Sequence, residues 1–159
     1  MPTITVKKDI EEIKRKLIEK NTETLMVIGC GICARISKTG GPKETEEMKD
    51  ILIKNGFKIL KNNKLPNTIE EGLCNYSVVK KLAEDIDDNS FDSILVLGCG
   101  AGLKCISDNF KNKKIIAGLN TVGVGVKGRL TCVACGDCNF DNGCKRLNVW
   151  ENIIKNIKK

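Results

Sequence analysis

The sequence contains no histidine among its 159 residues. Without an imidazole, this chain alone cannot build a Ser-His-Asp triad, a Cys-His nucleophile pair or a histidine-ligated zinc or iron site. Aromatic residues make up only 4% of the sequence, so stacking platforms for single-stranded nucleic acid are scarce. These absences predict that any chemistry runs through sulfur.

Long hydrophobic runs are also missing. The longest uncharged apolar runs, residues 25–34 and 94–103, are ten residues each, whereas a bilayer-spanning helix needs roughly twenty. Residues 1–8 lack the apolar core of a signal peptide. We therefore expect a cytoplasmic protein with no membrane partner.

Charge gives little specific information. The chain carries 27 Lys and Arg against 20 Asp and Glu, a net charge of +7. The last fifteen residues are basic, and we interpret them as a solvated helix face rather than a nucleic-acid contact.

Two segments of the chain echo each other. Residues 23–31 align without a gap to residues 92–100, and each pairs a short apolar run with Gly-Cys-Gly. This strand, turn and helix pattern predicts an α/β fold with a doubly wound, mostly parallel sheet built from two halves. In such a sheet the two turns meet at the carboxyl edge of the strands, which would bring Cys30 and Cys99 together.

The length predicts a single domain, 1–159. We expect an N-terminal helix within 1–22, a first α/β half over 23–91, a second over 92–131, a cysteine loop over 132–144 and a final helix over 145–159. Residues 61–72 should form a loop that brings Cys74 to the surface, and the glycine-interrupted residues 120–128 a flexible approach to the cysteine loop.

The nine cysteines are the main functional signal. They favour metal ligation over disulfides, because a reducing cytosol disfavours disulfides and nine thiols cannot all pair. One set lies near the end of the chain: Cys132, Cys135, Cys138 and Cys144. Its Cys-x2-Cys-x2-Cys opening is typical of ferredoxin-type cluster loops, although the fourth spacing differs, so a zinc site with four thiolates stays open.

The other cysteines form a discontinuous set. Cys30, Cys33, Cys99 and Cys105 are candidate ligands of a second centre, with Cys74 as a substitute. Cys105 also suits a small buried hydrophobic position. Cys30 and Cys33 alone could form a thioredoxin-like dithiol. A nicotinamide site is not expected at residues 98–102, because the third glycine comes one position early and no acidic residue follows about twenty positions on.

In combination and in order, residues 29–34, 39–41, 97–102 and 132–138 resemble the methylenetetrahydrofolate reductase C-terminal family. This family supplies the small cysteine-rich subunit or domain that accompanies a flavin-bearing folate barrel in acetogens and related anaerobes. The resemblance implies an iron-sulfur or zinc module that passes electrons to a flavin on a partner. A catalytic (β/α)8 barrel needs about 200 residues or more, so folate reduction cannot occur on this chain alone.

The resulting hypothesis is a cytoplasmic electron-transfer subunit, not itself catalytic, with one or two iron-sulfur clusters of the 4Fe-4S type. Its expected partner is a flavin-dependent methylenetetrahydrofolate reductase of one-carbon metabolism, or another redox protein. The alternatives are a zinc-stapled interaction module without redox activity and, third, the dithiol oxidoreductase.

Overall fold

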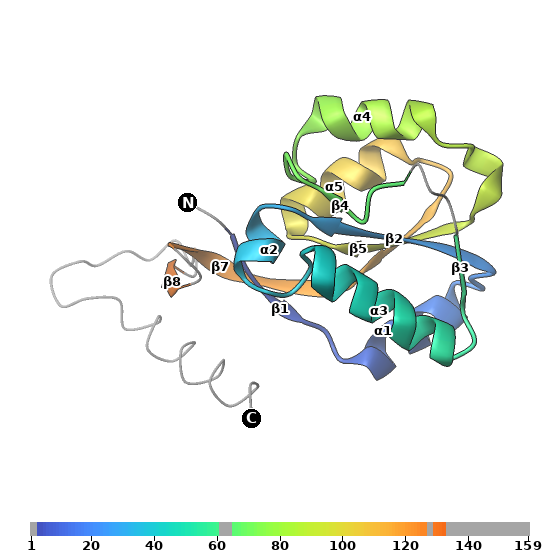
Figure 1. Cartoon of the computed structure of the whole chain (residues 1–159), viewed down its shortest axis with the longest axis horizontal. Helices are drawn as coiled ribbons and strands as arrows, with labels where there is room; N and C mark the ends of the chain where they lie inside the picture. The colour runs from blue at the N-terminus through green and yellow to red at the C-terminus, as the bar shows by residue number, and fades with distance from the viewer. Residues whose placement is uncertain (1–2, 61–64, 127–128, 133–159) are drawn as a thin grey trace, which may run out of the picture.

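The computed structural model describes residues 3–60, 65–126 and 129–132. Two sheets and their helices make up this part of the chain (Figure 1). The strands are β1 (Thr3–Lys7), β2 (Thr24–Cys30), β3 (Lys58–Ile59), β4 (Thr68–Ile69), β5 (Ser93–Leu97), β6 (Lys114–Ala117), β7 (Leu119–Val126) and β8 (Arg129–Cys132). The helices are α1 (Ile10–Glu19), α2 (Cys33–Ile36), α3 (Pro42–Lys54), α4 (Tyr76–Asp85) and α5 (Gly100–Asn109), with a 3-10 turn at Asp88–Ser90.

The larger sheet has the order β3-β2-β5-β6, with β4 pairing β2 as well. All of its ladders are parallel. The two central strands have all but one of their residues buried, as expected for strands covered on both faces. The predicted α/β class with a mostly parallel sheet is therefore confirmed.

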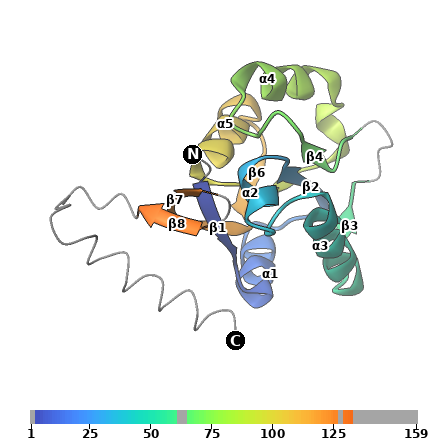
Figure 2. The same ribbon diagram turned by 60° about the vertical axis from the view of Figure 1, so that its left-hand side comes forward.

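Helices cover both faces of this sheet. Figures 1 and 2 place α1 and α3 on one face and α4 and α5 on the other. Helix α1 is amphipathic, since Ile13 and Leu17 are fully buried, and Asp9 caps its N-terminus. Its neighbouring Ile18 faces solvent, with 64% of its surface exposed.

A second, antiparallel sheet has the order β1-β7-β8. Strand β7 begins two residues after β6 ends, so the chain leaves the parallel sheet and enters the antiparallel one almost without interruption. The amide of Lys8 donates to the carbonyl of Gly118 at the junction (3.1 Å). The antiparallel sheet is thereby anchored to the last parallel strand.

Two local predictions are wrong. Residues 120–126 are not a flexible approach, because pairing with β1 and β8 makes them a strand despite their glycines. The predicted loop over 61–72 contains β4, whereas the helix predicted within 1–22 is present as α1, with β1 before it. In each case hydrogen bonds to a distant partner strand stabilise an element whose local signal is weak.

The cysteine loop after Cys132 and the final helix over 145–159 lie outside the described residues. Within the described ranges, no helix combines the length and apolar character that a membrane crossing requires.

Candidate thiolate site

The two Gly-Cys-Gly turns lie side by side at the carboxyl edge of the parallel sheet. Strands β2 and β5 are neighbours with Gly29 paired to Leu97, so each strand leads its turn to the same edge. After β2 the chain goes to α3 on one face, and after β5 it goes to α5 on the other (Figure 1). Ligands of open α/β sheets bind at such a switch point.

The first turn is held by backbone contacts. Cys30 ends β2, is 3% exposed, and donates its amide to the Gly40 carbonyl (3.0 Å). A Cβ atom on Gly29 would stand 2.3 Å from the Gly40 oxygen, and one on Gly31 would stand 2.6 Å from the Cα of Glu70. Both glycines are therefore required for close packing around Cys30.

The second turn starts a helix directly. Cys99 is the N-cap residue of α5 and is 5% exposed. The following amide, of Gly100, donates to the hydroxyl of Thr121 on β7 (3.0 Å). A Cβ atom on Gly98 would stand 3.9 Å from the Cβ of Cys30, which fixes how closely the two turns approach.

Cys33 joins the two turn cysteines. It is the first residue of α2 and is half-buried. Burial raises the pKa of the Cys33 thiol, and thiolates at Cys99 and Cys30 raise it further. Hydrogen bonds from the amide and hydroxyl of Thr3 to its sulfur act in the opposite direction without overcoming burial. Cys30 and Cys99 are thus close enough to Cys33 to affect its ionisation.

Cys74 and Cys105 form a separate pair. Burial raises the pKa of Cys105, as do the neighbouring Cys74 and Asp108. Leu73, which precedes Cys74 in the chain, is fully buried and packs against Gly98 and Gly102. Cys74 is exposed, as predicted, whereas Cys105 is 7% exposed in the core. The structure thus groups Cys105 with Cys74 more directly than with Cys30, Cys33 and Cys99.

The donor chemistry at this edge suits a soft metal centre. Among the described residues, no cationic side chain influences the pKa of Cys33, and amide donors to sulfur are typical of thiolate-metal sites. In the described part of the chain, however, no three ligand side chains converge closely enough to hold one ion.

The C-terminal cysteine set is described only at its first member. Cys132 ends β8, and its backbone pairs with Val124 of β7. The other three predicted ligands of this set lie outside the described residues: Cys135, Cys138 and Cys144. Their ligand assignment stays a prediction.

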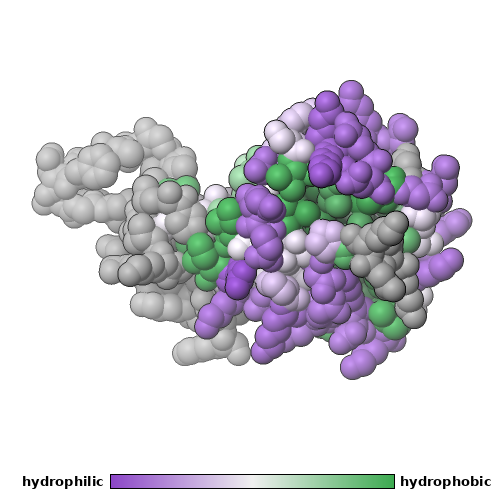
Figure 3. All heavy atoms as spheres, turned by 45° about the horizontal axis from the view of Figure 1, so that its top comes forward, coloured by the Kyte–Doolittle hydropathy of each residue, from purple (hydrophilic) through white to green (hydrophobic). Residues whose placement is uncertain are grey.

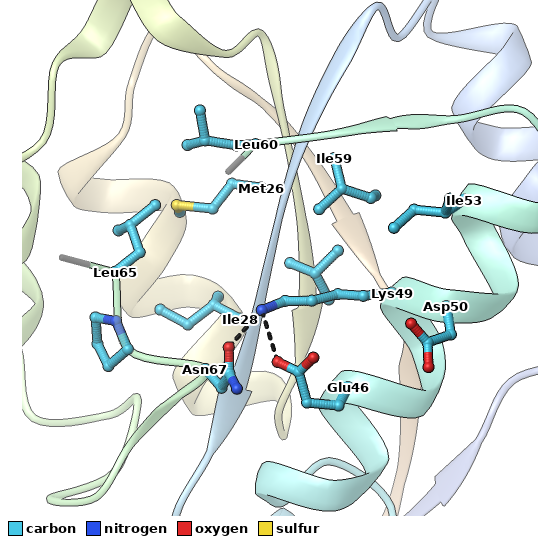
Figure 4. Close-up of a pocket in the computed structure, with 12 residues that line it drawn as sticks. Met26, Ile28, Glu46, Lys49, Asp50, Ile53, Ile59, Leu60, Leu65 and Asn67 are labelled. Atoms are coloured by element: carbon cyan, nitrogen blue, oxygen red, sulfur yellow. Dashed lines mark hydrogen bonds and ion pairs between the residues drawn. The ribbon is translucent and has the colours of Figure 1, made fainter. Parts of the chain in front are cut away.

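A cavity of about 370 Å³ lies away from the cysteines, on the flank of β2 that faces α3 (Figure 4). Its walls are shared between apolar side chains, such as Met26 and Ile28, and polar ones, such as Glu46 and Asp50. At one side Lys49 binds both Glu46 (3.1 Å) and Asn67. Its charge is satisfied within the protein, and the cavity contains no thiol, so we assign the sulfur chemistry elsewhere.

Apolar side chains reach the surface beside Cys33. Ile32 and Ile36, which flank it in the chain, are 40% and 42% exposed, and Tyr76 at the start of α4 is 55% exposed. Figure 3 shows apolar side chains breaking through the polar surface in a band across one face of the molecule. Exposed apolar residues next to a functional site favour contact with another protein.

Two residues of the site were not found from the sequence. Thr3 contacts the Cys33 sulfur, and Thr121 caps the amide after Cys99. The alternation of residues 3–7 is a weak strand signal that could have indicated β1. Nothing local indicates Thr121, because its role depends on β7 lying beside α5.

Comparison of the chain with protein-family models, with curated protein sequences and with solved structures found no match. The relationship to the methylenetetrahydrofolate reductase C-terminal family therefore stays a prediction from the cysteine and glycine motifs.

Proposed function

We propose that the protein is an electron-transfer module that binds an iron-sulfur cluster through its cysteines. The observation that carries this proposal is the meeting of Cys30, Cys33 and Cys99 at the switch point of the parallel sheet. Cys33 and Cys99 are 66 residues apart in the sequence, so the fold brings these thiols together. Cysteine thiolates are the usual ligands of iron-sulfur clusters.

The ionisation of Cys33 is compatible with metal binding. The pKa of the Cys33 thiol is raised, chiefly by burial, so the free thiolate is disfavoured there. A metal ion removes this obstacle, because binding to it deprotonates the thiol. A site that disfavours the free thiolate but offers amide and hydroxyl donors to sulfur suits a metal-bound thiolate.

The module would act with a partner that carries the substrate. Because the chain has no histidine, acid-base chemistry near neutral pH would have to come from other groups. The bound cluster would supply one-electron transfer, and the exposed Ile32 and Ile36 beside Cys33 suit a protein contact. By its motifs, the proposed partner is a flavin-dependent methylenetetrahydrofolate reductase.

Anaerobic purification, followed by metal analysis and absorption spectroscopy, tests the cluster. We expect bound iron with acid-labile sulfide and a broad visible absorption that dithionite bleaches. Zinc without visible absorption would contradict electron transfer and support a structural module. Protein without either metal, with freely alkylated thiols, would overturn metal binding altogether.

Co-purification tests the partner separately. The chain, tagged at one end in its native host, should retain a flavoprotein that reduces methylenetetrahydrofolate. An Ile32→Asp, Ile36→Asp variant should lose that protein if the apolar surface beside Cys33 forms the contact. Unchanged retention by this variant would contradict the proposed docking surface.

A further inference from the structure

A groove of about 590 Å³ lies between α4 and the segment that contains β4. Figures 1 and 2 both place β4 beneath α4. One wall is a single face of α4, which carries Val78, Leu82 and Asp85 at spacings of four and three residues. The other wall comes from the segment 65–71. The groove is large enough to receive a short segment of another molecule.

The floor of this groove is apolar and continuous with the core. Ile69 and Ile86 line it and are 4% and 8% exposed. Leu65, Val78 and Leu82 also line it, and they pack against the core while staying partly exposed. Apolar surface that stays open in this way favours contact with another protein.

The rim of the groove is acidic, although the whole chain has a net charge of +7. Three carboxylates line it, those of Glu70, Glu71 and Asp85, against the single ammonium of Lys81. Glu70 is neutralised by Arg35 (2.8 Å). No residue of the described chain forms an ion pair or hydrogen bond with the carboxylate of Glu71 or Asp85. One carboxylate on each wall is therefore available to a cation.

The groove adjoins the turn and helix that hold Cys33. Glu70, on the rim, pairs with Arg35 of α2, and a Cβ atom on Gly31 would stand 2.6 Å from the Cα of Glu70. The exposed Ile32 lies between Gly31 and Cys33 in the chain. A segment bound in the groove would thus lie beside the apolar surface proposed above as the contact with the partner.

We propose that this groove binds a short segment of a partner protein that presents apolar side chains together with Lys or Arg. The apolar side chains would cover the floor, and the cation would lie between Glu71 and Asp85. Complementary charge at the rim would select such a segment against acidic ones. The inference deepens the proposed function by giving the chemistry of the partner contact, and it rests on that function only for the partner's role in electron transfer.

Fluorescence anisotropy on the full-length chain tests the groove. The probe is a labelled peptide of leucine and arginine, and two matched peptides carry glutamate for arginine or serine for leucine. We expect the leucine-arginine peptide to bind about tenfold more tightly than either matched peptide. Non-specific attraction to a chain of net charge +7 would favour the glutamate peptide instead. Equal binding of all three peptides, or binding of none, would overturn the proposal.

Two neighbouring substitutions on α4 locate the binding. Asp85→Lys and Glu84→Lys change the net charge equally and both alter exposed side chains, but only Asp85 lines the groove. We expect Asp85→Lys to weaken binding of the leucine-arginine peptide about tenfold, and Glu84→Lys to weaken it by less than about twofold. An equal loss in the two variants would place the peptide elsewhere and contradict the proposal.

Other occupants give different results. A dimer of the chain that Asp85→Lys dissociates in sedimentation would assign the groove to a second copy. Displacement of the peptide by hexylamine at equal affinity would assign it to a small amine, and either result would refute a partner segment. Peptide binding requires no metal. Protein that binds iron but no peptide would therefore contradict only this inference, and protein that binds the peptide but no metal would contradict only the proposed cluster.

Discussion

The two halves of the molecule begin with the same strand and Gly-Cys-Gly turn, but they use it differently. In the first half, both glycines press against backbone atoms, and the turn leads into the four-residue helix α2. In the second half, Gly98 packs against the Leu73 side chain and Gly100 has open space around it, and the turn starts the ten-residue helix α5.

This difference shows what the repeated motif specifies. The first glycine of each motif allows close packing, against Gly40 in the first half and Leu73 in the second, and the cysteine follows at the sheet edge in both halves. The last glycine is required for packing only in the first half, where the backbone of Glu70 lies against Gly31. The corresponding Gly100 has no such close neighbour. One motif therefore gives a rigid turn in the first half and a helix start in the second.

The largest expected effect comes from breaking the first turn. Gly29→Ala would place a Cβ atom 2.2 Å from the Thr45 hydroxyl and 2.3 Å from the Gly40 carbonyl. Because a backbone atom cannot move aside cheaply, we expect the free energy of unfolding to fall by about 4 kcal/mol. Urea denaturation measures this loss.

Gly100→Ala is the matched control in the second half. The nearest atom to its new Cβ would be 3.9 Å away, so we expect a change within about 0.5 kcal/mol. Similar losses for the two variants would show that the halves do not differ as described.

The next effect concerns the side chain that holds the second turn. Leu73→Ala should cost about 3 kcal/mol, because Leu73 is fully buried and its loss leaves a cavity between Gly98 and Gly102. The half-buried Leu82 offers a control, for which truncation should cost about 1 kcal/mol. A smaller loss for Leu73→Ala than for Leu82→Ala in denaturant titrations would refute this role.

A smaller effect links the starts of the two halves. The Asp92 carboxylate, just before β5, accepts from the amides of Glu23 (2.9 Å) and Thr24 (2.7 Å) at the start of β2. Burial alone would raise the pKa of Asp92, but hydrogen bonds from Ser93 and these amides, with the Lys114 charge, hold it below its ordinary value. We expect Asp92→Asn to cost about 1 kcal/mol at neutral pH.

The pH dependence of that cost has a definite sign. Because the folded-state pKa is lowered, the carboxylate stabilises the fold above its ordinary pKa and loses this contribution as the pH falls through the folded-state value. The stability difference between wild type and Asp92→Asn should therefore shrink in acid. Urea midpoints that stay equally separated from neutral pH to below the ordinary carboxyl pKa would contradict the assignment.

The smallest expected effect distinguishes the two threonines that contact the two turns. Thr3 donates to the Cys33 sulfur, whereas Thr121 accepts from the Gly100 amide. With a cluster bound, Thr3→Val should lower the reduction potential by roughly 40 mV, equivalent to about 1 kcal/mol of lost hydrogen bonding to the reduced form. Anaerobic redox titration should show a smaller shift for Thr121→Val; equal shifts would contradict a specific role for Thr3.

Much of the parallel sheet could be predicted because its signals are local. The buried runs of β2 and β5 and the amphipathic stripe of α1 each appear within a short window of sequence. The antiparallel sheet could not be predicted in this way. Its central strand β7 contains Gly123 at a φ of 155°, and it forms only by pairing with β1 and β8, which lie far from each other in the sequence.

The candidate site, too, could be predicted from the sequence only in part. The meeting of Cys30 and Cys99 follows from the repeated motif and the known geometry of parallel sheets. The grouping of Cys105 with Cys74 does not, because it depends on where Leu73 packs against α5. Spacing along the chain gives no information on that contact.

The iron content of cysteine variants tests the central claim most directly. After anaerobic reconstitution with iron and sulfide, the Cys30→Ser, Cys99→Ser double variant should lose most of the iron and labile sulfide that the wild type binds. Cys74→Ser should bind as much as the wild type, because the Cys74 thiol is exposed and is not among the cysteines that influence the pKa of Cys33. Full iron binding by the double variant, or an equal loss in Cys74→Ser, would contradict a shared thiolate site at the junction of the two halves.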